Sequence, residues 1–418
     1  MSRRTQFARY AGLLLALLIV WQPAGASGVA PEPRKSTTKA RAISAKSSVS
    51  RKAAVHAAVH SSSSIHKSSS VTRSTAVVRS TTTHKPTTSH RYVGVPTFAD
   101  STKDDIAQFD DPIVRAAAVQ GLGRYNGSVV AIDPSNGRIL TVVNQKLAFS
   151  PGFIPCSTIK PTIALAALEE GLITRDSMLK VAPRKYMNLT EAMAHSNNIF
   201  FESLGSQMGF DKVSHYAQLL GLGELAGYSI PEEQSGKVPA EPPKRGGVAR
   251  MSSFGEGIQM TPLELASMGA TLANGGTMFY LQYPRSQEAQ RDFTPRVKRQ
   301  LEIGPYLSDI REGMQAAVLY GTAKSSYDHD GESPLGKTGT CSDESSRLGW
   351  FLSYDGQEHP KVVLVVLMRG RSRKVEGPVA AEIAGRIYRN LKERNFFGAD
   401  HQQPVAAIAA APASPTNR

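Results

Sequence analysis

The stretch of sequence that decides the fold is Pro155-Cys156-Ser157-Thr158-Ile159-Lys160-Pro161, and the apolar run Thr162–Leu168 follows it. This run has no polar face, which predicts a helix that is buried on all sides. Gly171 stands where a glycine ends a helix as a C-terminal cap. Ser157 and Lys160 are three residues apart, so we expect them side by side on the first turn of this helix.

A buried lysine beside a serine has a chemical use. If burial lowers the pKa of Lys160, its amine can take the proton of Ser157 and turn the hydroxyl into a nucleophile. The free N–H groups at the start of the helix would stabilise an oxyanion formed at that serine. The spacing alone is weak, because Ser36–Lys39 and Ser64–Lys67 repeat it in low-complexity sequence with no helix behind them. The prediction that Ser157 is a nucleophile therefore depends on the rest of the sequence around it.

The chain of 418 residues is uneven in composition. Residues 1–26 combine early arginines, an eleven-residue apolar run and small residues, which is the layout of a signal peptide; an uncleaved N-terminal anchor is the alternative. Residues 27–95 are rich in Ser, Thr, Lys and Arg and predict a disordered linker. Residues 399–418 predict a disordered Ala/Pro-rich tail. Residues 96–398 are then one catalytic domain, large enough to consist of two lobes.

The basic charge belongs to the N-terminal segments. Residues 1–26 hold three Arg, and residues 27–95 hold twelve Lys and Arg and one Glu, which accounts for the whole formal charge of +14. The predicted domain is therefore neutral, and nucleic acid is not an expected partner. We expect the linker to be attracted to anionic wall polymer or to a membrane surface. A solvated spacer is the alternative.

Two early and three late strand-like segments frame a mostly helical middle. The strand-like segments are 128–133, 138–143, 335–341, 348–354 and 361–368. The helical segments are 110–122, 189–208, 211–220, 261–274, 305–320 and 376–391. Asn136-Gly137 favours a turn between the first two strands. This order predicts an α+β fold with an antiparallel sheet whose early and late strands meet across the sequence.

Three short motifs follow one another along the chain. They are Ser157–Lys160 (S-x-x-K), Ser196-Asn197-Asn198 (S-x-N) and Lys337-Thr338-Gly339 (K-T-G). With these motifs in this order the chain resembles penicillin-binding transpeptidases, and class A β-lactamases share the signature. The likeness extends over nearly all of 115–393. It includes segments 127–143, 205–223 and 255–276, Gly321-Thr322-Ala323 and Gly349-Trp350-Phe351.

The resemblance implies a five-stranded antiparallel sheet flanked by helices plus an all-helical lobe. It implies that Ser157 attacks a D-Ala-D-Ala carbonyl to form an acyl-enzyme, that Lys160 is the base, and that Ser196 relays a proton to the leaving amine. The implied substrates are peptidoglycan stem peptides, with β-lactams as inhibitors or substrates. It calls for no metal and no organic cofactor.

The remaining motif residues are implied to bind substrate. Asn198 would hold the substrate amide and orient Lys160. Lys337 would supply positive charge near the site, Thr338 would hydrogen-bond the terminal carboxylate, and Gly339 would complete the substrate-binding strand. The backbone N–H groups of Ser157 and Thr340 would form the oxyanion hole.

Cys156 and Cys341 are the two cysteines of the chain, and we expect them to form a disulfide. A signal peptide would send them to an oxidising compartment. They flank Ser157 and Thr340, whose N–H groups would point at one oxygen atom, so their Cα atoms would lie within bridging distance. The pair resembles one found in class A carbapenemases. Two buried free thiols are the alternative.

The predicted function is a D,D-transpeptidase or carboxypeptidase that acts in the periplasm or cell envelope. The alternatives are a serine β-lactamase and a non-catalytic penicillin sensor or wall-binding module. Class A β-lactamases use a glutamate on a loop after S-x-N, and Glu232-Glu233 and Asp343-Glu344 are expected to be solvated surface instead. The large N-terminal pedestal domain and the glycosyltransferase domain of some relatives have no counterpart here. Cys156 stands where transpeptidases carry a small residue.

Overall fold

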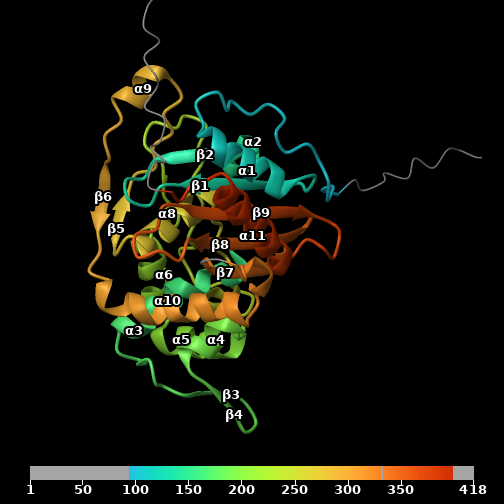
Figure 1. Cartoon of the computed structure of the whole chain (residues 1–418). Helices are drawn as coiled ribbons and strands as arrows, with labels where there is room; N and C mark the ends of the chain where they lie inside the picture. Colours follow the sequence, from blue (N-terminus) through green and yellow to red (C-terminus); the bar gives the residue numbers. More distant parts are fainter. Residues whose placement is uncertain (1–93, 331–332, 399–418) are drawn as a thin grey trace, which may run out of the picture. The chain divides into compact units, whose positions relative to one another are not determined.

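The computed structural model describes residues 94–330 and 333–398 (Figure 1). The predicted signal peptide, the linker up to residue 93 and the C-terminal tail lie outside the described residues. The described residues belong to the compact unit Thr87–Arg418.

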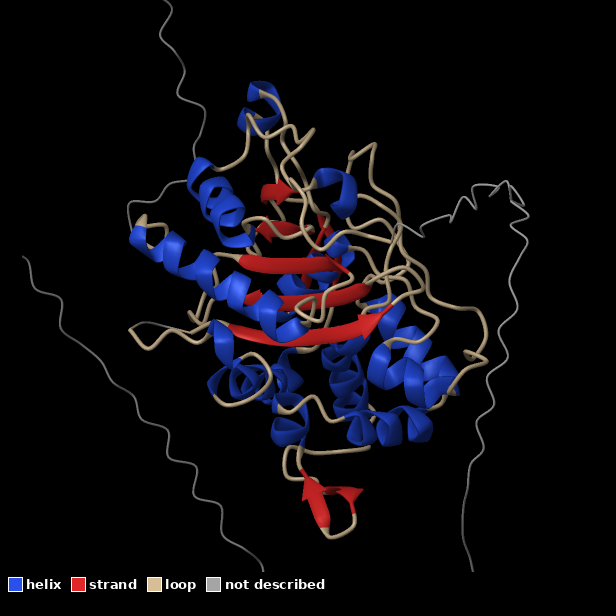
Figure 2. Ribbon diagram, turned by 90° about the vertical axis from the view of Figure 1, so that its right-hand side faces the viewer, coloured by secondary structure: helices blue, strands red, loops and turns tan. Residues whose placement is uncertain are grey.

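Five antiparallel strands form the central sheet (Figure 2). They are β1 (Gly127–Ile132), β2 (Ile139–Val143), β7 (Leu335–Ser342), β8 (Arg347–Tyr354) and β9 (Val363–Gly370), in the spatial order β2-β1-β9-β8-β7. The early strand β1 pairs with the late strand β9, for example Val130 with Val365. The predicted meeting of the two ends of the sequence is confirmed, and β7, which carries the K-T-G motif, lies at a sheet edge.

Strands β1 and β2 form the predicted hairpin. The Gly137 amide donates to the Asp133 carbonyl at 2.9 Å, and Gly137 has a φ of 78°, a conformation that glycine adopts without strain. Asn136 caps the turn by accepting the amide of Arg138 at 2.8 Å. The Asn-Gly pair therefore sets the turn as the sequence predicts.

Helices cover both faces of the sheet, because side chains alternate along each strand. On β1, Val129 and Ala131 pack in the apolar cluster formed with α1 (Pro112–Leu122) and α11 (Gly377–Glu393). Val130 and Ile132 pack in the second cluster, to which α8 (Pro262–Ala273) belongs. Figure 2 shows the sheet between these layers.

The second lobe is mainly helical and lies below the sheet in Figure 1. Its elements are the 3₁₀ turn η1 (Cys156–Ile159), α3 (Lys160–Glu169), α4 (Leu189–Ala194), α5 (Asn198–Met208), α6 (Phe210–Leu219), α7 (Gly247–Phe254) and α10 (Gly304–Leu319). Smaller elements outside this lobe are α2 (Gln145–Ala148), α9 (Gln287–Arg291) and η2 (Lys324–Ser326). Helix α3 is buried from Lys160 to Leu168, and Gly171 follows it with a φ of 65°, as predicted.

Local sequence explains the helix starts. Thr261 and Glu264 form a capping box at the start of α8, in which each side chain satisfies the backbone amide of the other. Asp111 caps α1 by accepting the amides of Ile113 and Val114, both at 2.9 Å.

Two expectations for the helical middle need correction. The segment 189–208 is not one helix, since α4 and α5 are separated at 195–197. The region also contains two small two-stranded sheets, β3 (Leu179–Ala182) with β4 (Lys185–Met187) and β5 (Thr277–Phe279) with β6 (Val297–Gln300). These strands are too short for their periodicity to be read from the sequence.

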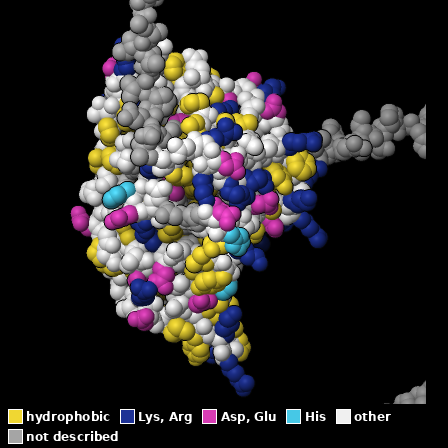
Figure 3. Space-filling model, in the orientation of Figure 1, with side chains coloured by type: hydrophobic (Ala, Val, Ile, Leu, Met, Phe, Trp, Pro, Cys, Tyr) yellow, Lys and Arg dark blue, Asp and Glu magenta, His cyan; other side chains and the backbone are white. Residues whose placement is uncertain are grey.

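On the face seen in Figure 3, Lys and Arg side chains are interspersed with Asp and Glu. This mixture agrees with the neutral charge balance of residues 96–418. None of the helices in the described part has the length and apolar character needed to cross a membrane.

Candidate active site

The turn η1 and the start of α3 place Ser157 beside Lys160. Lys160 donates its backbone amide to the Ser157 carbonyl, which puts both side chains on one turn. Lys160 Nζ lies 3.0 Å from Ser157 Oγ. Ser157 is 8% exposed and Lys160 is fully buried. The side-by-side arrangement expected from the spacing is therefore present, although Ser157 stands in a 3₁₀ turn rather than in the α-helix.

The break between α4 and α5 brings the S-x-N motif to the same lysine. Ser196 has a φ of 53°, a strained left-handed conformation for a serine, which reverses the chain between the helices. Asn197 then caps α5 by accepting the amide of Phe200 at 3.0 Å. As a result, Lys160 Nζ lies 2.7 Å from the Ser196 carbonyl, 2.9 Å from Ser196 Oγ and 2.7 Å from Asn198 Oδ1.

Strand β7 adds the third motif. Lys337 is fully buried, and its Nζ donates to Ser196 Oγ at 2.8 Å and to the Thr338 carbonyl at 3.0 Å. A Cβ on Gly339 would lie 3.0 Å from the Pro155 carbonyl oxygen and 3.2 Å from Cys156 Cβ. Glycine therefore lets the strand approach η1 closely.

Ser196 Oγ lies between the two buried amines of Lys160 and Lys337. A hydroxyl has one proton and accepts through its lone pairs, so it can donate to one amine while it accepts from the other. This arrangement is a continuous path for a proton between the two lysines.

Burial and mutual repulsion act on the lysine charges. Burial lowers the pKa of Lys160 well below its usual range, the nearby Lys337 lowers it further, and Glu202 opposes the shift. Burial lowers the pKa of Lys337 to about 7. Among the described residues, no carboxylate forms an ion pair with either amine.

The oxygens around Lys160 fit a neutral amine. The Ser196 carbonyl and Asn198 Oδ1 can only accept, and they use the two N–H groups of a neutral amine. The lone pair then remains for one hydroxyl proton, from Ser157 Oγ at 3.0 Å or from Ser196 Oγ at 2.9 Å. The neutral amine of Lys160 can therefore take the hydroxyl proton of Ser157.

Thr338 is held by a residue outside the three motifs. Thr322 Oγ1 and Thr338 Oγ1 are 2.6 Å apart, and the Thr322 amide donates to the Ala194 carbonyl at 3.0 Å. A Cβ on Gly321 would lie 2.2 Å from that same carbonyl oxygen. The Gly321-Thr322 segment thus ties the end of α4 to β7.

Cys156 and Cys341 form a disulfide with a Cα–Cα distance of 5.6 Å, as predicted. The bridge joins η1 to β7 beside Ser157 and Thr340. Thr340 pairs with Gly349 of β8, and its Oγ1 accepts the amide of Gly377 at 2.8 Å. The backbone of Thr340 is therefore fixed on both sides.

Two residues near Ser157 have no place in the sequence motifs. Ser157 Oγ lies 3.5 Å from the carbonyl oxygen of Ser253 on α7, and Ser253 Oγ donates to Glu202 Oε1 at 3.0 Å. Glu202 follows Asn198 by four residues, so both lie on one face of α5. That helical spacing is the signal by which the sequence could have identified it.

Among the acidic residues predicted at the solvated surface, Glu344 is exposed, Asp343 is half-buried and Glu233 is buried. Glu232 is exposed as expected, whereas Glu233 is 9% exposed and accepts the amides of Ala226 and Gly227, both at 2.9 Å. Burial raises its pKa. The carboxylate of Glu233 is buried because it accepts hydrogen bonds from these two backbone amides.

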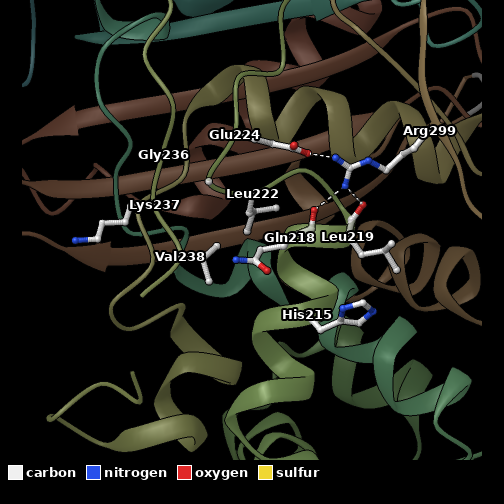
Figure 4. A pocket seen from close by; sticks show the side chains of 10 residues that line it. His215, Gln218, Leu219, Leu222, Glu224, Gly236, Lys237, Val238 and Arg299 are labelled. Atoms are coloured by element: carbon white, nitrogen blue, oxygen red, sulfur yellow. Dashed lines mark hydrogen bonds and ion pairs between the residues drawn. The ribbon is translucent and has the colours of Figure 1, made fainter. Parts of the chain in front are cut away.

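A separate pocket of about 490 Å³ lies at the C-terminal end of α6 (Figure 4). No residue of the three motifs lines it. Arg299 crosses it and donates to the carbonyls of Gln218 and Leu219 at 2.8 and 2.9 Å, and it also pairs with Glu224. These groups cap the helix and need no ligand. In the described part, no group of three or more His, Cys, Asp and Glu side chains could hold a metal ion.

Known proteins are similar to this chain over the same region. Stage V sporulation protein D of Bacillus subtilis is 25% identical, with 62% of this chain and 48% of that protein covered. A probable peptidoglycan D,D-transpeptidase, PbpC, of Pseudomonas aeruginosa is 24% identical, with 61% and 51% covered. The chain thus spans about half the length of these relatives.

Solved structures show the same fold. Penicillin-binding protein A of Mycobacterium tuberculosis, described as a ceftriaxone acyl-enzyme complex, has a TM-score of 0.59 at 21% identity, with 68% of this chain and 78% of that one covered. The D,D-transpeptidase domain of a peptidoglycan glycosyltransferase from Eggerthella lenta has a TM-score of 0.56 at 20% identity, with 68% and 82% covered. Residues 127–389 match the profile of the penicillin binding protein transpeptidase domain, which is more than half of the chain. The protein belongs to this family of transpeptidase domains.

Proposed function

We propose that this protein is a penicillin-binding D,D-transpeptidase or carboxypeptidase that acts on peptidoglycan stem peptides through an acyl-enzyme on Ser157. The observation that carries the proposal is the 3.0 Å distance between Ser157 Oγ and the buried amine of Lys160. Similarity to proteins named D,D-transpeptidases and to one described as a cephalosporin acyl-enzyme supports it.

In the first step, Ser157 Oγ attacks the carbonyl carbon between the two terminal D-alanines while Lys160 Nζ takes the hydroxyl proton. The C–N bond then breaks. The departing amine of D-alanine receives a proton from Ser196 Oγ, which regains one from the neighbouring lysines. The product is an ester on Ser157. The N–H groups of Ser157 and Thr340 stabilise the intermediate oxyanion.

The other motif residues bind the peptide. Asn198 orients Lys160 through its Oδ1 and holds the substrate amide. Lys337 supplies positive charge, and Thr338, held by Thr322, donates to the terminal carboxylate. Gly339 belongs to the same substrate-binding strand and lets it lie close to the turn that carries Ser157. An acceptor amine then takes the acyl group in transpeptidation, or water takes it in the carboxypeptidase reaction.

The N-terminal segments belong to the same proposal. Residues 1–26 direct export to the periplasm or cell envelope, or anchor the chain there, and residues 27–95 form a basic linker that contacts anionic wall polymer or a membrane surface. Residues 96–398 are the catalytic domain, and residues 399–418 are a tail.

A serine β-lactamase is the second candidate, because it shares the acylation step and because a cysteine pair flanks the same two motifs. Labelling with a fluorescent penicillin and turnover of a chromogenic cephalosporin separate the two. Stable labelling without turnover supports the transpeptidase, and rapid turnover supports the β-lactamase. Absence of both supports a non-catalytic wall-binding module.

Ser157→Ala should abolish labelling while the thermal unfolding curve stays close to that of the wild type. Ser64→Ala is the matched control, because it removes the serine of another S-x-x-K and should label normally. Labelling that persists in Ser157→Ala contradicts the proposed nucleophile.

A further inference from the structure

Helix α5 contributes an acidic side chain that the three motifs do not include. Glu202 stands one turn after Asn198, and its Oε1 accepts the hydroxyl of Ser253 at 3.0 Å. Ser253 is fully buried near the end of α7. Its carbonyl oxygen lies 3.5 Å from Ser157 Oγ. The carboxylate is therefore connected to the nucleophile through one residue.

The carboxylate of Glu202 is the acidic group that acts on the charge of Lys160. The groups within hydrogen-bond distance of Nζ are neutral oxygens of Ser157, Ser196 and Asn198. The ionisable side chains that shift the pKa of Lys160 are Lys337 from β7 and Glu202 from α5. From α5 the ring of Phe201 also faces the amine, with its centroid 5.4 Å from Nζ.

These two ionisable groups act in opposite directions. Burial and Lys337 favour the neutral amine of Lys160, and Glu202 favours the ammonium. A general base is most effective when its pKa lies near the working pH, since an amine whose pKa is too low is a weak base. Glu202 limits how far the base is weakened.

We propose that Glu202 is a positioning residue for acylation: it holds Ser253, whose carbonyl lies against the nucleophile, and supplies a negative charge that acts on the buried amine of Lys160. The proposal rests on the proposed function, in which Lys160 is the base for Ser157. Glu202 itself does not touch the substrate.

Glu202→Gln separates the charge from the hydrogen bond, because the amide oxygen still accepts the hydroxyl of Ser253. Loss of the negative charge lowers the pKa of Lys160 further, so the acidic limb of the pH profile of the acylation rate should move to lower pH. The rate on the alkaline plateau should fall severalfold because the base is weaker. Penicillin acylation rates are measured across pH with the full chain.

Two controls complete the design. Ser253→Ala removes the hydroxyl and keeps the carboxylate, so the plateau rate should fall without a shift of the acidic limb. Glu312→Gln removes an exposed carboxylate of α10 that pairs with Arg175, and its profile should match the wild type. Glu202→Met, neutral and of similar length, repeats the measurement if the glutamine variant does not fold.

An unshifted acidic limb in Glu202→Gln overturns the proposal, and so does an equal shift in Glu312→Gln or Ser253→Ala. A normal acylation profile combined with loss of acyl-enzyme hydrolysis also overturns it, because Glu202 would then act on deacylation. The proposed function fails separately, if Ser157→Ala still labels.

Discussion

Cys156 and Cys341 are joined by a disulfide although 185 residues separate them. Cys156 directly precedes Ser157, and Cys341 directly follows Thr340, so the bridge fixes the distance between the two residues proposed to form the oxyanion hole. It links the helical lobe to the edge strand of the sheet. The geometry of the site thus has a covalent constraint in addition to its hydrogen bonds.

Removing the bridge with Cys156→Ser and Cys341→Ser together should lower the penicillin acylation rate at least about tenfold, because oxyanion-hole donors act only when correctly placed. Loop-closure entropy over the 185 residues between the cysteines gives an expected loss of about 5 kcal/mol in the free energy of unfolding. Stopped-flow acylation and urea unfolding measure the two effects. Mass spectrometry of unreduced protein should find no alkylatable thiol, and an unchanged acylation rate would mean that the bridge does not support the oxyanion hole.

Lys160→Ala should slow acylation by about 10²- to 10⁴-fold, the usual contribution of a general base. Lys160→Arg is the informative companion, since it keeps the positive charge but does not lose its proton in proteins. Both variants should be slow if Lys160 is the base. A fast arginine variant would assign the residue an electrostatic role instead.

Glu264 should make the stability of the domain depend on pH. Its two oxygens accept the amides of Gly223 at 3.2 Å, Gly236 at 2.7 Å and Thr261 at 2.9 Å, and the two glycines line the pocket of Figure 4. Burial raises its pKa from 4.5 to about 7. A carboxyl whose folded pKa is raised stabilises the fold fully below the unfolded value and loses this contribution as pH rises through the folded value.

The wild type should therefore lose about 3 kcal/mol, relative to Glu264→Gln, as pH rises from about 4.5 to above 7. The glutamine variant should be less stable than the wild type at the acidic end, because its NH₂ group faces a backbone donor. Urea unfolding of both proteins over this range measures the difference. A difference that does not change with pH would contradict the raised pKa.

Deleting residues 27–93 should leave the acylation rate and the unfolding curve unchanged, because the described domain begins at residue 94. The deletion removes most of the net positive charge, so salt-sensitive binding to isolated cell walls should fall. Sedimentation with cell walls at several salt concentrations measures it. Unchanged binding would leave the basic segment as a spacer, and slower acylation would mean that it contributes to the site.

Much of the fold is predictable from local sequence. The apolar run after Lys160 has no polar face and becomes the buried helix α3, and Asn136-Gly137 becomes the hairpin turn. The long segment 189–208 was predicted incorrectly as one helix. Its break depends on Ser196 in a left-handed conformation, which the contacts to Lys160 and Lys337 stabilise.

The sequence by itself determined which residues we propose as the site. Ser157 and Lys160 are neighbours on one turn, and short-range spacing is enough to predict their contact. The order of the three motifs identified the family, and the two cysteines beside them predicted the bridge. These conclusions need only local geometry or a pattern that other proteins share.

Only the tertiary structure decided how the charges are balanced. Lys337 reaches Ser196 across 141 residues, and Ser253 reaches Ser157 across 96, so neither contact follows from spacing. The pKa of Lys160 depends on which groups surround it after burial, and Glu202 matters because α5 and α7 pack together. Long-range packing sets the dielectric surroundings and the distances between charges, and these quantities determine whether a lysine is a base.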